Sequence, residues 1–143
     1  MYKQIMIAVD GSKASSLALK EAIELAKNQK SKLCVIHIVD TLYEGDVDRE
    51  AFVELIRKQG QEVLNSIKKK LSRVKIEFEM KLTELTPSKS QIAEKLVDEA
   101  SAWSADLIII GTHGRRGIQH ILTGSVAEEV IRISKIPVLL VKK

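Results

Sequence analysis

The sequence predicts an α/β protein built on an open, mainly parallel sheet of five strands. Five short apolar runs alternate along the chain with segments whose apolar residues recur at helical spacing. Most of these runs are continuous blocks of aliphatic residues, which is typical of strands covered on both faces. Strands separated by helices favour parallel pairing with right-handed crossovers. We therefore expect three layers, with four main helices divided between the two faces of a flavodoxin-like or Rossmann-like sheet.

The first half of the chain contains three of the expected strands. Lys3 to Val9 and Leu33 to Val39 are apolar enough for central positions in the sheet. Lys75 to Leu82 alternates apolar and charged residues, which indicates a half-exposed strand at an edge. Between the first two strands, Ser12 is expected to cap a helix.

A long helix is expected from Val47 to Leu71. Gly60 lies on its apolar side, although glycine in a helix interior costs about 1 kcal/mol relative to alanine. Either Gly60 permits a close approach to the sheet, or it marks a break between two shorter helices.

The second half repeats the alternation of helix and strand. A helix containing Ile92 to Ala100 is expected after Ser88 to Gln91, which can form a capping box. The strand Asp106 to Ile110 follows, and then a helix from Ser125 to Ser134. The final strand is Val138 to Val141.

The five strands fit the flavodoxin-like order 3-2-1-4-5, which places the alternating third strand at an edge. In that order the first and fourth strands are neighbours at the point where the winding reverses, and ligands bind beside that point at the carboxyl ends of the strands. Those ends are Ala8-Val9-Asp10 and Gly111-Thr112-His113-Gly114. We therefore expect these two loops to meet.

A glycine-rich loop joins the fourth strand to the last helix. Gly111, Gly114, Gly117 and Gly124 let several amides converge on one point, and the helix that starts at Ser125 adds partial positive charge there. This arrangement is suited to a phosphate. Alternatively, the glycines only shape a loop and Ser125 only caps the helix.

The side chains beside the glycines also leave two interpretations open. Arg115 and Arg116 either pair with phosphate oxygens or are solvated. Asp10 either binds a ribose hydroxyl or only makes a turn with Gly11. Val39 either offers an apolar wall to a purine or belongs to the core.

The sequence offers no compelling catalytic or metal-binding set. His37, inside a strand, is expected to be a satisfied core histidine, because no second ligand stands at metal-binding spacing beside it. His113 and His120 flank the glycine loop without a nucleophile or an orienting carboxylate nearby in the sequence. We therefore expect no catalytic residue and no metal ligand among the side chains.

Composition narrows the function classes. The 143 residues are enough for one domain, expected over residues 1–143. A net charge of +4 and an aromatic content of 3% disfavour nucleic-acid binding. No apolar segment approaches membrane-spanning length, and no leader precedes the first strand, so we expect a cytoplasmic protein without a membrane partner. Cys34 is the single cysteine and is expected to be an inert, buried thiol.

The loop spacing resembles a known family. Gly111-x2-Gly114-x9-Gly124-Ser125 differs from the Walker and Rossmann patterns. It closely resembles the G-x2-G-x9-G-(S/T) signature of the universal stress protein family, in the subgroup that binds ATP. The similarity also covers Ile5 to Ser12, Ala105 to Gly111 and the ending through Pro137 to Val141.

The resemblance implies a nucleotide site. Adenine would lie near Val39 and the end of the first strand, with the ribose near Asp10. The phosphates, accompanied by Mg²⁺, would lie on Gly111, Gly114, Gly124 and Ser125. The full candidate set adds neighbours in the same segments: Ala8, Val9, Thr112, His113, Arg115, Arg116, Gly117 and Val126. One departure is Leu85, because family members often have glycine at that position before the proline.

The resemblance also implies an assembly and a function. Family members usually form homodimers, and here Val138 to Val141 would be the pairing edge. The expected function is that of an ATP-binding stress-response or signalling protein with at most slow ATP hydrolysis. The alternative is a dimeric interaction module that binds no nucleotide.

Overall fold

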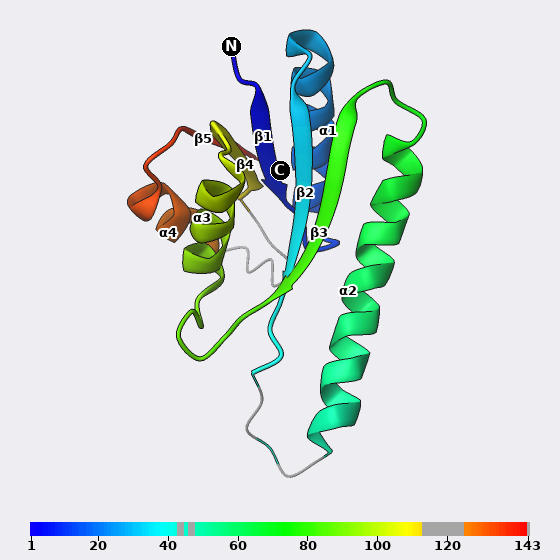
Figure 1. Ribbon diagram of the computed structural model, residues 1–143, viewed down its shortest axis with the longest axis vertical. Coiled ribbons are helices and arrows are strands. Elements are labelled where there is room, and N and C mark those ends of the chain that lie inside the picture. The colour runs from blue at the N-terminus through cyan, green and yellow to red at the C-terminus, as the bar shows by residue number, and fades with distance from the viewer. Residues whose placement is uncertain (43–44, 46–47, 113–124, 143) are drawn as a thin grey trace.

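The computed structural model describes residues 1–42, 45, 48–112 and 125–142 (Figure 1). Within these residues the chain forms one sheet with the strand order β3-β2-β1-β4-β5, in which all neighbours are parallel. The strands are β1 (Gln4–Ala8), β2 (Lys32–Val39), β3 (Glu77–Glu84), β4 (Leu107–Gly111) and β5 (Val138–Val141). The predicted fold class and strand order are confirmed.

Helices cover both faces of this sheet, as the sequence predicted (Figure 1). They are α1 (Lys13–Gln29), α2 (Arg49–Leu71), α3 (Ile92–Trp103) and α4 (Ser125–Ile133). On one face, Leu19 of α1 and Leu64 of α2 pack with Ile7 of β1. On the other, Leu96 of α3 and Val130 of α4 pack in a second cluster. Strand residues therefore alternate between an α1/α2 face and an α3/α4 face.

The helix starts show where local sequence rules hold. Ser12 is the N-cap of α1 and its hydroxyl accepts a hydrogen bond from the Ser15 amide, as expected. The capping box expected at Ser88 to Gln91 is not formed, because Gln91 is the N-cap of α3 and makes no side-chain cap. Instead, Thr86 and Lys89 pair through two backbone hydrogen bonds of 3.2 and 3.0 Å. Ser88 lies inside this turn, and its hydroxyl is within hydrogen-bond distance of the Thr86 hydroxyl.

Gly60 lies in the middle of α2, which runs unbroken from Arg49 to Leu71. A Cβ atom added to Gly60 would lie 2.9 Å from side-chain atoms of Val39 and Leu82 and 3.0 Å from Cδ2 of His37. Gly60 therefore permits the close approach of α2 to β2 and β3, the first of its two predicted roles.

We expect Gly60→Ala to lower the free energy of unfolding by about 1 kcal/mol. Overpacking of this kind costs about 1–3 kcal/mol, which exceeds the gain of up to about 1 kcal/mol in helix propensity. Urea denaturation measures the difference, with the exposed Ser66→Ala in the same helix as the control for propensity alone. A more stable Gly60→Ala protein would contradict the packing explanation.

Candidate functional site

The tips of β1 and β4 lie together at the carboxyl edge of the sheet. Ile7 pairs with Ile109, and Asp10 and Thr112 each come three residues later in parallel strands. The first turn of α1 also lies against the end of β4, because a Cβ atom on Gly111 would be 2.7 Å from the carbonyl oxygen of Ala14. The described parts of the two predicted loops therefore meet.

Asp10 lies half-buried in a turn at the tip of β1. Its Oδ1 atom accepts a hydrogen bond of 2.9 Å from the Ser12 amide, and its own amide donates to the Ser15 hydroxyl at 3.3 Å. Gly11 takes a left-handed conformation with φ of 83°, which glycine adopts without strain. The turn that the sequence suggested is present, and it fixes the carboxylate at this edge.

Val9 connects Asp10 to the sheet. Its side chain belongs to the core of the α1/α2 face, whereas Ala8 packs on the α3/α4 face. The Val9 amide donates to the Ile36 carbonyl at 2.9 Å. The Val9 carbonyl accepts a hydrogen bond from Nδ1 of His37 at 2.6 Å, so His37 is the satisfied core histidine that the sequence predicted.

Val39 is buried at the end of β2. Its carbonyl accepts a hydrogen bond of 3.1 Å from the Leu85 amide, and its side chain packs against Gly60. The Val39 side chain thus lies in the core, and the role of Val39 beside a purine stays a prediction. Ile38 is the residue of β2 that packs on the α3/α4 face beside this edge. Sequence reasoning missed Ile38, although the alternation of side chains along a strand pointed to it.

The side-chain hydroxyl of Thr112 is an unusual feature of this edge, because it is a buried polar group. The residue is only 2% exposed, and its amide donates to the Val141 carbonyl at 3.1 Å. Its Oγ1 atom is buried and has no hydrogen-bond partner among the described residues. Ile110 packs on the α3/α4 face, so Thr112, two residues later, lies toward the same face. A buried hydroxyl without a partner is unfavourable, so a bound polar group would be stabilised there.

The N-terminus of α4 also lies at this edge. α4 connects two parallel neighbours, β4 and β5, so it runs antiparallel to them and begins near their carboxyl ends. Val126 packs against the core of the α3/α4 face. Ser125 is the first residue of α4. The remaining candidates, His113, Gly114, Arg115, Arg116, Gly117 and Gly124, lie outside the described residues.

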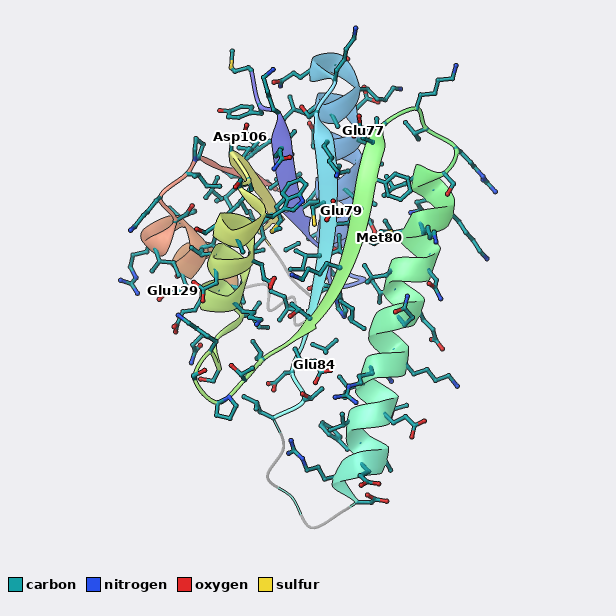
Figure 2. All side chains as sticks on the ribbon, viewed as in Figure 1. Glu77, Glu79, Met80, Glu84, Asp106 and Glu129 are labelled. Atoms are coloured by element: carbon teal, nitrogen blue, oxygen red, sulfur yellow. The ribbon has the colours of Figure 1, made fainter. Side chains whose placement is uncertain are left out.

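An ion-pair cluster at the ends of β2 and β3 was not expected. Figure 2 shows Glu84 at the carboxyl end of β3. Its carboxylate accepts hydrogen bonds from Nε of Arg57 at 2.6 Å, from a second Arg57 nitrogen at 3.1 Å and from the Thr41 hydroxyl at 3.0 Å. The Arg57 hydrogen bond is the main reason why the pKa of Glu84 is lowered. This cluster attaches α2 to the same edge of the sheet.

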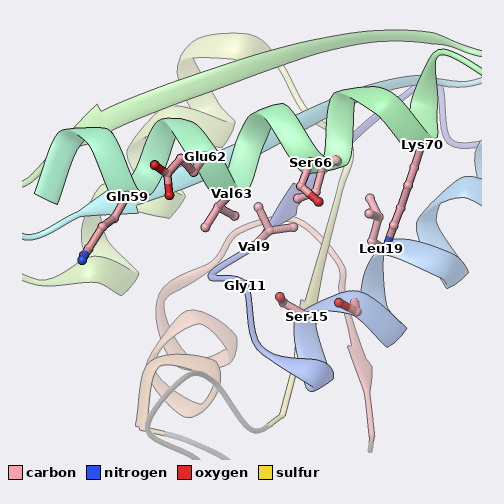
Figure 3. A pocket seen from close by; sticks show the side chains of 11 residues that line it. Val9, Gly11, Ser15, Leu19, Gln59, Glu62, Val63, Ser66 and Lys70 are labelled. Carbon is pink, nitrogen blue, oxygen red and sulfur yellow. The ribbon is translucent and has the colours of Figure 1, made fainter. Parts of the chain in front are cut away.

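A hollow of about 560 Å³ lies next to the tip of β1, on the side of the sheet covered by α1 and α2. Figure 3 shows Val9 and Gly11 beneath it, Ser15 and Leu19 on the α1 side and Lys70 on the α2 side. It opens on the α1/α2 face, opposite to the face toward which Thr112 lies. The hollow therefore borders the tip of β1 on the α1/α2 face.

Two kinds of feature were not found in the described part of the chain: a cluster of metal-binding side chains and a membrane-spanning helix. No group of three or more His, Cys, Asp or Glu side chains in it could hold a metal ion. None of its helices combines the length and apolarity needed to cross a membrane.

Comparison with known proteins identifies related chains. The universal stress protein family model matches residues 1–142. Universal stress protein MJ0531 of Methanocaldococcus jannaschii is 37% identical over 147 residues, covering 100% of this chain and 84% of that protein. The solved structure of protein MJ0577 is 30% identical with a TM-score of 0.81, covering 100% of this chain and 97% of that one. A universal stress protein family structure from Burkholderia pseudomallei is 29% identical with the same TM-score, covering 98% and 96%.

Two more distant structures of the same fold contain nucleotides. A universal stress protein family protein from Arabidopsis thaliana has AMP bound, with 16% identity, a TM-score of 0.70 and coverage of 99% and 92%. The universal stress protein from Archaeoglobus fulgidus is in complex with dAMP, with 22% identity, a TM-score of 0.63 and coverage of 99% and 98%. Both ligands share the adenine base.

The Arg57–Glu84 pair predicts a pH-dependent contribution to stability. Because the folded-state pKa of Glu84 is lowered, its contribution is complete above the ordinary glutamate range and is lost as the pH falls through the folded-state value. We expect Glu84→Gln to reduce stability at pH 7 by about 0.5–1 kcal/mol, because this pair is partly exposed and screened. The difference from wild type should shrink between about pH 5 and pH 3.

Chemical denaturation at several pH values measures this difference. Glu77→Gln, which removes an exposed carboxylate from the same strand, is the matched control. A Glu84→Gln deficit that stays constant down to pH 3 would show that the carboxylate charge is not responsible.

Proposed function

The chain belongs to the universal stress protein family, and from this premise we propose that it binds ATP at the carboxyl edge between β1 and β4. The observation that carries the proposal is the buried Thr112 hydroxyl, which has no partner among the described residues and lies at the same edge of the sheet as the start of α4. In this proposal the protein is a single cytoplasmic domain that acts in nucleotide-dependent stress response or signalling.

The proposed site uses both strand tips. The Asp10 carboxylate, fixed by the Ser12 amide, binds the ribose, and Thr112 donates its hydroxyl proton to an oxygen of the nucleotide. The base lies near Ala8 and the end of β2, where Ile38 and Val39 lie on opposite faces. The phosphates lie at the start of α4, on the predicted loop residues His113, Gly114, Arg115, Arg116, Gly117 and Gly124, together with Gly111, Ser125 and Val126.

The chemistry of the described residues is compatible with Mg²⁺ held by the nucleotide itself. Mg²⁺ commonly keeps several waters and binds phosphate oxygens with few protein ligands. The AMP and dAMP complexes of the two distant relatives support adenine as the base. Hydrolysis is at most slow in this proposal, because the sequence offers no compelling general base; His37 is buried and donates to the Val9 carbonyl.

Calorimetry with Mg-ATP tests the proposal on wild type and on Thr112→Val. Wild type should bind, and Thr112→Val should bind about ten to a hundred times more weakly, because a hydrogen bond to a charged ligand contributes about 1.5–3 kcal/mol. Without nucleotide, Thr112→Val should be at least as stable as wild type, because it removes a buried hydroxyl that has no partner in the described part of the chain. Weaker binding together with higher stability would separate a ligand contact from simple damage to the fold.

Thr83→Val, in β3, is the matched control and should leave ATP affinity unchanged. Absence of Mg-ATP binding by wild type would reject the proposed function and favour the interaction module without nucleotide. Equal affinities of wild type and Thr112→Val would reject the role given to Thr112.

We further propose a homodimer formed through β5. The two terminal strands of the sheet differ in chemistry: β3 exposes Glu77, Glu79 and Lys81, whereas β5 is wholly apolar and its Leu139 is 38% exposed. Charged side chains protect an edge strand from pairing, and an apolar edge without them is open to it. The α4 helix, which precedes β5, exposes Ile131 as well.

We expect Leu139→Lys to convert the dimer to a monomer without unfolding it, because a charge would be buried between paired edges. Light scattering after size-exclusion chromatography measures the mass. Leu55→Lys, which replaces an exposed leucine on α2, is the matched control and should remain dimeric. A monomeric wild type, or a Leu139→Lys protein that stays dimeric, would contradict the β5 interface.

A further inference from the structure

His37 occupies an unusual position in the β1–β2 ladder. It is 6% exposed, in the strand next to Asp10, and its ring reaches sideways to the Val9 carbonyl at 2.6 Å. A carbonyl oxygen only accepts hydrogen bonds, so Nδ1 is the protonated ring nitrogen. The imidazole thus donates to the backbone directly before the Asp10 turn.

This hydrogen bond stands where the next backbone rung would be. In a parallel ladder the Val9 amide donates to the Ile36 carbonyl, and the following rung runs from the Ile38 amide to the Val9 carbonyl. The structure has the first of these bonds, at 2.9 Å, but the β1–β2 register ends at Ala8 and Ile36. The Val9 carbonyl accepts from the imidazole instead.

Packing holds the ring in this place. Cδ2 of His37 would lie 3.0 Å from a Cβ atom on Gly60, so α2 covers the ring closely and the missing side chain of Gly60 provides the space. Val39, on the same face of β2, is buried beside Gly60 as well. The ring therefore has little freedom to leave the Val9 carbonyl, and the carbonyl keeps its buried partner.

Ile38 is the residue whose amide would donate to the Val9 carbonyl if the ladder continued by one more rung. The bond from the Leu85 amide shows that the Val39 peptide pairs with β3, and successive residues of a central parallel strand pair with opposite neighbours. The Ile38 amide therefore points toward β1, beyond the end of its ladder. Its side chain packs on the α3/α4 face, the face toward which Thr112 lies.

We propose that His37 is a positioning residue for the nucleotide site: by supplying the donor to the Val9 carbonyl, it ends the β1–β2 ladder one rung early and leaves the Ile38 amide available to the bound nucleotide. The inference rests on the proposed function for its ligand. The imidazole also orients the peptide that precedes Asp10, so one buried ring sets the geometry of both strand tips.

The first test uses nucleotide-free protein and amide hydrogen exchange followed by NMR. In wild type the Ile38 amide should exchange much faster than the Ile36 amide. In His37→Leu, which removes the donor, the Ile38 amide should close onto the Val9 carbonyl, and its protection relative to Ile36 should rise about tenfold. His37→Asn is similar in size to leucine but keeps a side-chain donor, so its ratio should stay near that of wild type.

Using the ratio of two amides in one strand separates this effect from a loss of global stability, which would lower both protections together. Wild-type protein in which Ile38 is as protected as Ile36 would overturn the proposal, even if neither variant folds. An unchanged ratio in a folded His37→Leu protein would overturn it as well.

The second test is Mg-ATP calorimetry on the same three proteins. His37→Leu should bind about tenfold more weakly than wild type, because one hydrogen bond to the ligand is lost, and His37→Asn should restore most of the affinity. Equal affinities of His37→Leu and wild type would overturn the positioning role. Failure of wild type to bind Mg-ATP would instead reject the proposed function, and the exchange ratio would still decide whether His37 ends the ladder.

Discussion

The candidate site depends on one close backbone approach, between the end of β4 and the first turn of α1. A single methyl group on Gly111 would lie 2.7 Å from the Ala14 carbonyl oxygen, and 2.9 Å from its carbonyl carbon. Backbone atoms cannot move aside as the end of a flexible side chain can, so any larger residue would separate the two segments. Because α1 begins directly after the Asp10 turn, this contact also determines how near Asp10 lies to Thr112.

The two faces of the sheet have different roles at the carboxyl edge. On the α1/α2 face, His37, Val39 and Gly60 fit together tightly and leave no room for an added methyl group. On the α3/α4 face, Ala8 and Ile38 are only partly buried, and the Thr112 hydroxyl has no partner among the described residues. One face thus fixes the positions of the strand tips. The other retains polar and backbone groups that a ligand can use.

The sequence predicted those features of the fold that patterns of neighbouring residues determine. The charged and apolar alternation of β3 identified an edge strand, and Ser12 identified the start of α1, since both signals lie within a few residues. The Arg57–Glu84 pair and the bond from His37 to Val9 were beyond such reasoning, because each joins residues that only the tertiary fold brings together. Val39 was expected near the base on a family resemblance; its side chain is in the core, and its place in the site stays a prediction. The predictions for residues 113–124 stay predictions.

Thr112 links the proposed nucleotide site to the proposed dimer edge through a single residue. Its hydroxyl lies toward the α3/α4 face without a partner among the described residues, and its amide donates to the carbonyl of Val141, the last residue of β5. A ligand that binds the hydroxyl stabilises the folded state, because the unfolded chain has no such site. The same ligand restrains the Thr112 peptide and therefore the end of β5. Within the described residues, this rung of the ladder joins the proposed nucleotide site directly to the proposed dimer edge.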